Sequence, residues 1–269
     1  MKKIVVLALI FNSFTFVFGQ QKANTYSKWY LKPAAGINIP LTRLLNGEIT
    51  DNLFEYGDNS YYWQIISGNY FFLQNWGVEF TYQDGNSQSI AGRADRFNSE
   101  IVKQYSDNYF VSPSSGAQYD DYSTIGGNIQ RGYLGLVYRI EKPKYIILPK
   151  LFIGVTSFIT DWGRADLKEK GTNSVYELTY DSGKRPNDHF TLAPSVTFGY
   201  RLSKRLIANI DILYSYYKTD IVFVKEIRNM FTKEITSQTI DYKKNMHTLT
   251  IGFGLIIELK HVHATADLL

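Results

Sequence analysis

Cysteine is absent from all 269 residues of the chain, and this absence excludes several classes of protein. Small exported domains often depend on disulfides, so another element must close this structure. A lipoprotein anchor needs a cysteine, and zinc sites usually combine cysteine and histidine at close spacing. The pair His261 and His263 offers too few ligands, and no glycine-rich phosphate loop leads from a strand into a helix. We therefore predict neither a metal site nor a cofactor.

The chain also has little net charge. Its formal charge is +4, and it falls to +2 (4 − 2) when Lys2 and Lys3 are removed. A nearly neutral chain gives no indication of a nucleic-acid partner.

Long hydrophobic runs are missing after Gly19, so no later segment is a helical membrane span. Before that point, two lysines precede an apolar run that ends at Phe18, and modest side chains occupy the positions of a cleavage site. This layout is typical of a secretory signal peptide. A retained anchor is disfavoured because the run is shorter than the ~20 residues that a spanning helix needs. We predict a signal peptide over residues 1–19 and an exported domain over 20–269.

The exported domain contains segments in which apolar and polar side chains alternate. The clearest one places His247, Leu249, Ile251, Phe253, Leu255, Ile257 and Leu259 on one face. An alternation of this length indicates a strand, and it exceeds the ~9–11 residues needed to cross a bilayer at a tilt. The predicted strands are about 29–38, 61–71, 76–83, 130–139, 151–160, 190–201, 206–217 and 246–259. The alternation changes phase within 61–71, which suggests a bulge there.

The links between these strands alternate in length. The short links are 72–75, 140–147 and 202–205, and the long ones are 39–60, 84–128, 160–188 and 218–245. In a soluble β-sandwich, the length of the links is not expected to differ between the two ends. The pattern predicts a closed antiparallel transmembrane β-barrel of about eight strands, with short periplasmic turns and long extracellular loops. We expect the longest link to be the most mobile part, with a short helix over 96–105.

Several motifs resemble those of small outer-membrane β-barrels of Gram-negative bacteria, the OmpA-like or porin-family eight-stranded type. They are Val17-Phe18-Gly19-Gln20, Trp29-Tyr30-Leu31-Lys32-Pro33-Ala34-Ala35-Gly36, Asn75-Trp76-Gly77-Val78-Glu79-Phe80 and Thr250-Ile251-Gly252-Phe253-Gly254-Leu255. The resemblance implies a place in the bacterial outer membrane, contact with its lipid and lipopolysaccharide, and no peptidoglycan-binding domain. Such barrels commonly end on an aromatic residue, whereas here a polar tail, 260–269, follows Leu259.

Charged residues gather on the face predicted to line the lumen. They are Lys32, Glu79, Arg131, Arg201, Asp211 and Glu258. One interpretation is a polar conduit or proton path. The other is a network of ion pairs, since eight strands leave an interior only wide enough for side chains to fill it, and buried charges must pair. We favour the second interpretation.

Histidine is scarce, and this limits the candidates for catalysis. His189 and His247 begin predicted strands and should lie at the extracellular rim. Some lipid A-modifying enzymes are small barrels with active residues at that level. A nucleophile must lie within hydrogen-bond reach of its base, but Ser182, Ser195 and Thr248 are near these histidines only in sequence. We predict no catalytic residue.

The longest link collects aromatic residues among Ser, Gly and Asn: Tyr105, Tyr109, Phe110, Tyr119 and Tyr122. This composition is typical of adaptable binding surfaces, although it also suits a variable surface without a dedicated ligand. We expect a non-enzymatic structural or surface-interaction role, such as envelope integrity, adhesion or partnership with an envelope machine. An extracellular or envelope protein is then a possible partner. The alternatives are a narrow channel or transporter, and a lipid A-modifying enzyme.

Overall fold

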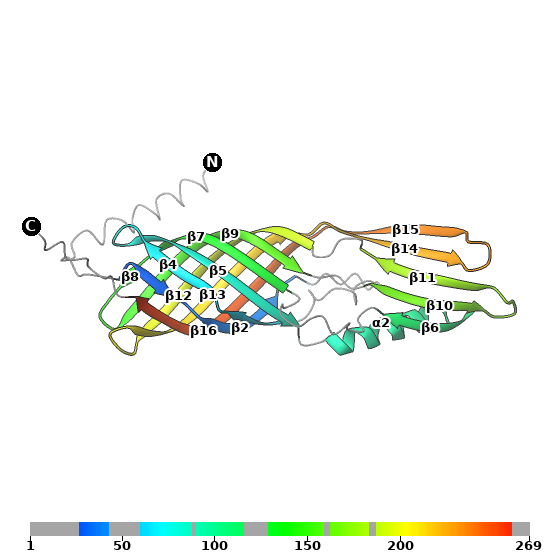
Figure 1. Ribbon diagram of the computed structural model, residues 1–269, viewed down its shortest axis with the longest axis horizontal. Helices are drawn as coiled ribbons and strands as arrows, with labels where there is room; N and C mark the ends of the chain where they lie inside the picture. Colours follow the sequence, from blue (N-terminus) through cyan, green and yellow to red (C-terminus); the bar gives the residue numbers. More distant parts are fainter. Residues whose placement is uncertain are drawn as a thin grey trace, which may run out of the picture.

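The computed structural model describes residues 27–42, 60–87, 90–115, 129–158, 162–182 and 187–259. The predicted signal peptide, 1–19, and the tail, 260–269, lie outside these ranges. The described residues form two antiparallel sheets and one helix, which follow one another along a single long axis (Figure 1).

Eight antiparallel strand positions close into a barrel. They are β1 (Trp29–Leu31) with β2 (Ala34–Pro40), β3 (Ser60–Gln64) with β4 (Ser67–Phe71), β5 (Trp76–Ser87), β7 (Ile129–Tyr138) with β8 (Ile140–Glu141), β9 (Tyr145–Phe158), β12 (Asn187–Arg201), β13 (Leu206–Lys218) and β16 (Asn245–Leu259). The first and last positions close the sheet, because Trp29 pairs with Leu259 and Ile37 pairs with Ile251. The predicted closed eight-stranded barrel is confirmed. We call the end that carries the links 72–75, 142–144 and 202–205 the turn end.

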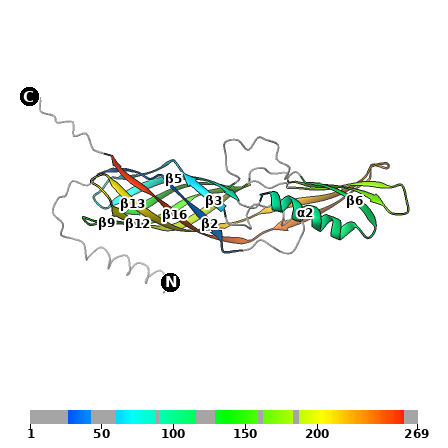
Figure 2. The ribbon, with the colours of Figure 1, turned by 90° about the horizontal axis from the view of Figure 1, so that it is seen from below.

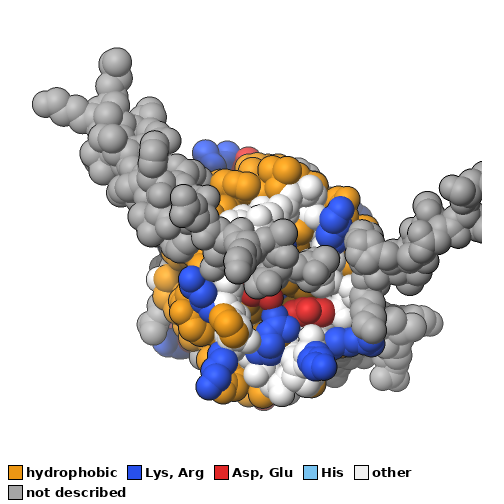
Figure 3. Space-filling model, turned by 90° about the vertical axis from the view of Figure 1, so that its left-hand side faces the viewer, with side chains coloured by type: hydrophobic (Ala, Val, Ile, Leu, Met, Phe, Trp, Pro, Cys, Tyr) orange, Lys and Arg blue, Asp and Glu red, His pale blue; other side chains and the backbone are white. Residues whose placement is uncertain are grey.

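The polarity of the barrel is the reverse of that of a water-soluble protein. Along β13, buried and exposed residues alternate, and the exposed ones are mostly apolar. Phe190 and Phe253 point outward with exposures of 70% and 62%, whereas Lys32 and Glu79 are buried inside. Figure 3, which looks onto the turn end, shows charged side chains near the centre and hydrophobic side chains along the outer edge. Closed strands with an apolar exterior and a polar interior suit a lipid environment.

The change of phase in the second strand position is a bulge. Trp63 pairs with Asp84, and Ser67 pairs with Thr81. Three residues, Gln64, Ile65 and Ile66, therefore lie opposite two residues of β5. Both isoleucines point outward, with exposures of 82% and 61%. The bulge therefore keeps both apolar side chains on the lipid-facing side.

The strand predicted over 151–160 begins earlier than expected, at Tyr145. The short link was predicted over 140–147, and the strand was predicted to begin only at Leu151. In the structure, Pro149 lies within β9 and pairs with Val196 of β12. On the other side of β9, its pairing with β7 and β8 is interrupted, because neither Tyr138 nor Arg139 pairs with it. The interruption lies beside Pro149, which has no N–H to donate.

The long links hold a second sheet, which the sequence pattern did not predict. Its strands are β6 (Tyr109–Ser115), β10 (Gly163–Glu169), β11 (Val175–Asp181), β14 (Ile221–Asn229) and β15 (Ile235–Tyr242), in the spatial order β15-β14-β11-β10-β6. The helix α2 (Ile90–Tyr105) extends the short helix expected at 96–105 and packs beside β6 (Figure 2). No helix within the described ranges is long and apolar enough to cross a membrane. We call the end of the barrel from which this sheet projects the sheet end.

An apolar cluster joins the second sheet to the barrel. It contains Phe97, Ile101, Ile129, Ala165, Leu167, Leu178, Tyr180, Tyr217, Ile221, Phe223, Tyr242 and Met246. Phe97 of α2 lies over Gly163, where an added Cβ would come within 2.1 Å of its ring, and it meets Tyr180 edge to face at 6.0 Å. Because Ile129, Tyr217 and Met246 belong to barrel strands, this cluster also covers the sheet end of the lumen.

Candidate functional site

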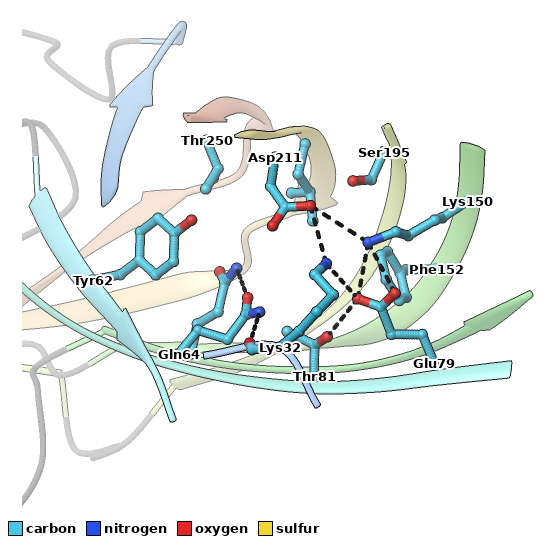
Figure 4. A pocket seen from close by; sticks show the side chains of 12 residues that line it. Lys32, Tyr62, Gln64, Glu79, Thr81, Lys150, Phe152, Ser195, Asp211 and Thr250 are labelled. Atoms are coloured by element: carbon cyan, nitrogen blue, oxygen red, sulfur yellow. Dashed lines mark hydrogen bonds and ion pairs between the residues drawn. The ribbon is translucent and has the colours of Figure 1, made fainter. Parts of the chain in front are cut away.

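Four charged side chains from four strand positions of the barrel meet inside the lumen, and Lys32 lies in the break between β1 and β2 (Figure 4). Lys32 Nζ lies 3.1 Å from Glu79 Oε1 and 3.0 Å from Asp211 Oδ1. Lys150 Nζ lies 2.9 Å from a carboxylate oxygen of Glu79 and 3.5 Å from Asp211 Oδ1. Each lysine thus contacts both carboxylates, and the formal charges of this quartet cancel.

Neutral side chains complete the hydrogen bonds of the two carboxylates. Asp211 accepts hydrogen bonds from the Thr197 hydroxyl and from Asn209 Nδ2, the latter at 2.8 Å. Glu79 accepts from Asn69 Nδ2 and from Thr81 Oγ1, the latter at 3.1 Å. Buried charges are tolerated when they are paired and their remaining lone pairs are satisfied, so the quartet is a stable filling for a narrow lumen.

Apolar side chains lie on both sides of the quartet, and toward the sheet end they are accompanied by buried polar side chains such as Gln64, Gln83 and Thr250. Toward the turn end the apolar layer contains Tyr30, Phe71, Val137, Ile146, Leu148, Ile207 and Ile256, and toward the sheet end it contains Tyr133, Phe152, Ala193 and Leu213. The cavity around the quartet has a volume of about 10 Å³, roughly the room for one water. An ion crossing the barrel would have to displace these side chains.

A second charged cluster closes the turn end. Arg201 pairs with Glu141, and its Nη1 lies 2.7 Å from Glu258 Oε1. Arg139 Nη1 donates to the Tyr30 hydroxyl at 2.9 Å, and that hydroxyl donates to Glu141 Oε2 at 3.2 Å. The Arg139 guanidinium also lies over the ring of Phe71, 4.1 Å from its centroid.

The six predicted lumen charges therefore do not form one network. Lys32, Glu79 and Asp211 meet in the quartet, whereas Arg201 and Glu258 lie near strand ends and pair at the turn end. These two are separated from the quartet because an apolar layer lies between them.

Arg131 belongs to neither cluster. It is 2% exposed, it points inward opposite Gln83 and Thr156, and its Nε and Nη1 have no hydrogen-bond partner. Within the described ranges, these two nitrogens of Arg131 therefore take no part in the predicted network of ion pairs.

Three charged residues of these clusters were not predicted. Lys150 was placed before its strand, although its inward parity is the same as that of Phe152, and this parity could have identified it. Arg139 and Glu141 were assigned to a strand end and a turn. Only the structure shows that both side chains turn back over the turn end of the lumen.

The predicted rim histidines have aromatic partners. His189 is buried and stacks on Tyr217, with ring centroids 5.7 Å apart. The ring of His247 contacts Tyr214 and Tyr216 on the outer side of the barrel. Ser195 is six residues from His189 on the same strand, about 20 Å away at the usual rise per residue. Among the described side chains, no group of three His, Asp or Glu could hold a metal ion.

The aromatic residues of the longest link are part of a packed structure where the structure describes them. Tyr105 ends α2, and its ring lies 6.3 Å from that of Tyr109 in β6, which in turn meets Tyr176 of β11 at 5.9 Å. Burial, and next the charge of Glu169, raises the pKa of Tyr109. Phe110 points to the opposite face and is 63% exposed. Tyr119 and Tyr122 lie outside the described ranges.

No protein-family model matches the chain, and no curated protein matches its sequence. Among solved structures, it is similar to a major outer membrane protein from Thermus thermophilus, with 11% identity, a TM-score of 0.37, and coverage of 87% of this chain and 99% of that chain. It is also similar to the outer membrane protease OmpT from Escherichia coli, with 8% identity, a TM-score of 0.36, and coverage of 89% and 99%. A third similar structure is the outer membrane protein AlkL, with 14% identity, a TM-score of 0.31, and coverage of 91% of this chain and 97% of that chain.

These likenesses transfer no residue role to this chain, and the narrower OmpA-like label stays a resemblance. The assignment rests on the strand pairing and on the apolar exterior. By that architecture, the chain is a closed eight-stranded antiparallel β-barrel of the outer-membrane type.

Proposed function

We propose that this protein is a non-enzymatic outer-membrane barrel that does not conduct solutes and that presents its second sheet at the cell surface as a platform for protein contacts. In this proposal the apolar exterior of the barrel contacts outer-membrane lipid and lipopolysaccharide. The platform serves adhesion or another surface interaction.

The filled lumen is the observation that carries this proposal. Three obstacles lie along the barrel axis: the cluster at the turn end, the quartet between its two apolar layers, and the apolar cluster at the sheet end. Moving an ion through the apolar layer toward the turn end would remove its hydration without supplying polar partners. The quartet is also neutral, so it does not concentrate ions of either sign.

The arrangement of the two ends supports the orientation. Ser27 and Leu259 lie together at the turn end, where the Ser27 hydroxyl donates to the Leu259 carbonyl at 2.6 Å. Bacterial barrels have short periplasmic turns and longer extracellular connections. We therefore place the turn end in the periplasm and the second sheet outside the cell. A rigid scaffold that holds a separate element in solvent is a common arrangement for binding.

Conductance across a planar bilayer tests the proposed absence of transport. The full chain, refolded in detergent and verified by far-UV circular dichroism, is reconstituted at increasing protein concentration. We expect no stable unitary steps in salt solutions of either low or high concentration. Reproducible unitary steps of the wild-type protein would show that the lumen opens. The alternative function, a narrow channel or transporter, would then replace this proposal.

A further inference from the structure

Among the described residues, one edge of the second sheet, the strand β15, is unprotected. It is the last strand on its side of the sheet, and among the described residues it pairs only with β14. Its residues from Ile235 to Thr239 are exposed, although successive side chains point to opposite faces. No helix or strand of the described chain therefore covers either face of this segment.

The opposite edge of the same sheet is protected. The strand β6 contains Pro113, which cannot donate to an added strand, and α2 packs beside it. By contrast, β15 has no proline, and its residues from Ile235 to Ile240 carry no charge. Edge strands usually contain charges, prolines or bulges that prevent pairing with another chain, so β15 lacks the common protections.

The register with β14 shows which backbone groups of β15 are free. Asn229 N donates to the Glu234 carbonyl at 2.9 Å, and Thr219 N donates to the Lys244 carbonyl at 2.9 Å. Both hydrogen bonds lie in the same register as the pairing of β14 with β15. In an antiparallel pair, every second residue bonds to the neighbouring strand, so the even-numbered residues of β15 direct their N–H and C=O groups toward β14. The free edge is formed by Ile235, Ser237, Thr239 and Asp241.

We propose that this edge pairs with the β15 edge of a second copy of the chain, antiparallel and centred on Gln238. This proposal rests on the surface display proposed above. Only an extended backbone matches N–H and C=O groups at this spacing, which makes added-strand pairing the fitting mode of contact. In this register the strand is complementary to itself, because each residue whose N–H and C=O groups are free lies opposite a residue of the second copy whose N–H and C=O groups are also free.

The side chains also fit this register. Ser237 lies opposite Thr239 of the second copy, and Ile235 lies opposite Asp241 of the second copy. On the other face, Thr236 lies opposite Ile240 of the second copy. The only charge of the strand, that of Asp241, therefore faces an isoleucine, so no like charges meet within the paired strands.

The direction of the strand determines what such a pair connects. The strands of the second sheet run along the long axis of the molecule, away from the barrel (Figures 1 and 2). Antiparallel pairing places the two barrels at opposite ends of the joined sheet. Two barrels held in this way lie in two membranes that face each other, so the contact would join one cell surface to another.

A proline substitution tests the edge without disturbing the sheet. Thr239→Pro removes a free N–H and leaves the hydrogen bonds to β14 intact, and Thr239→Ala is the matched control. In detergent, sedimentation equilibrium is expected to show a dimer for the wild type and for Thr239→Ala. Thr239→Pro should dimerise about tenfold or more weakly, because both copies lose a donor. Equal dimerisation of both variants, with unchanged circular dichroism, would overturn the proposal.

Cysteine cross-linking tests the register, since the chain has no cysteine of its own. An equimolar mixture of Ser237→Cys and Thr239→Cys should form a disulfide-linked heterodimer under mild oxidation, whereas neither variant alone should. Cross-linking of each variant alone would indicate parallel pairing within one membrane and would overturn the antiparallel arrangement. A wild-type protein that stays monomeric at all concentrations would also overturn the proposed pairing. If the barrel does not conduct in the planar-bilayer test, the proposed function would still stand in that case.

Discussion

Lys150 of β9 lies 2.9 Å from a carboxylate oxygen of Glu79 in β5, although β7 separates the two strands in the barrel wall. The contact crosses the lumen rather than running along the wall. The same lysine reaches Asp211 of β13 at 3.5 Å. Lys150 thus connects strands from opposite sides of the barrel and balances the charge of its centre.

Removal of Lys150 should destabilise the barrel strongly. Lys150→Met leaves the two carboxylates with Lys32 as their only paired cation among the described residues, and an uncompensated buried charge costs about 3–5 kcal/mol. Urea unfolding in detergent micelles measures this loss. The double variant Glu79→Gln with Lys150→Met restores neutrality and should lose less than the sum of the two single variants. Additive losses would show that the pair is not coupled.

Arg131 should respond differently from Lys150. Its buried guanidinium has two nitrogen atoms without a hydrogen-bond partner, so its removal relieves a desolvated charge. We expect Arg131→Met to change the free energy of unfolding by less than about 1 kcal/mol, or to increase it. The same urea titration measures it. A loss as large as that of Lys150→Met would contradict this account and would indicate that Arg131 has a partner in the folded barrel.

Two glycines on neighbouring strands should differ in their tolerance of a methyl group. A Cβ at Gly154 would lie 2.0 Å from the carbonyl oxygen of Gly132, whereas a Cβ at Gly132 would meet nothing within 4 Å. Gly154→Ala should therefore lower the free energy of unfolding by about 1–3 kcal/mol, because backbone atoms must move. Gly132→Ala serves as the control and should stay near the wild type. Equal effects in urea unfolding would disprove the proposed close approach.

Phe97 should hold α2 against the second sheet. It is fully buried over Gly163 and Tyr180, and truncation of a buried phenylalanine costs about 3–5 kcal/mol. Phe97→Ala should increase tryptic cleavage after Arg96 and Lys103 while the barrel stays resistant. Val102→Ala, at an exposed position of the same helix, should leave the cleavage rate unchanged. Parallel loss of barrel resistance would mean that the two parts unfold together.

The barrel could be predicted because its alternation is long and regular. The hairpin of β12 and β13 was expected over 190–201 and 206–217 and is observed over Asn187–Arg201 and Leu206–Lys218. The second sheet was not predicted, since its strands are short and one buried face uses small residues such as Gly163 and Ala165. A link as long as 84–128 is uncommon without internal structure, and that length was the available signal.

The lumen could be predicted only in part. The alternation along a strand shows which side chains point into the barrel, but strand tilt and stagger determine the height of each side chain along the barrel axis. Glu79 and Glu258 share the inward side, yet one lies at the centre and the other at the turn end. Lys150 was missed because the predicted strand began one residue after it, whereas the observed strand extends back past Pro149 to Tyr145. A proline is tolerated there since the neighbouring ladder is interrupted.

The most direct test of the account is site-specific labelling on intact cells. The chain lacks cysteine, so Phe231→Cys at the exposed tip of the second sheet and Lys204→Cys at the turn end each introduce a single thiol. With a maleimide that cannot cross the outer membrane, we predict labelling of Phe231→Cys on intact cells and of Lys204→Cys only after permeabilisation. Labelling of Lys204→Cys on intact cells, with Phe231→Cys protected, would contradict the account.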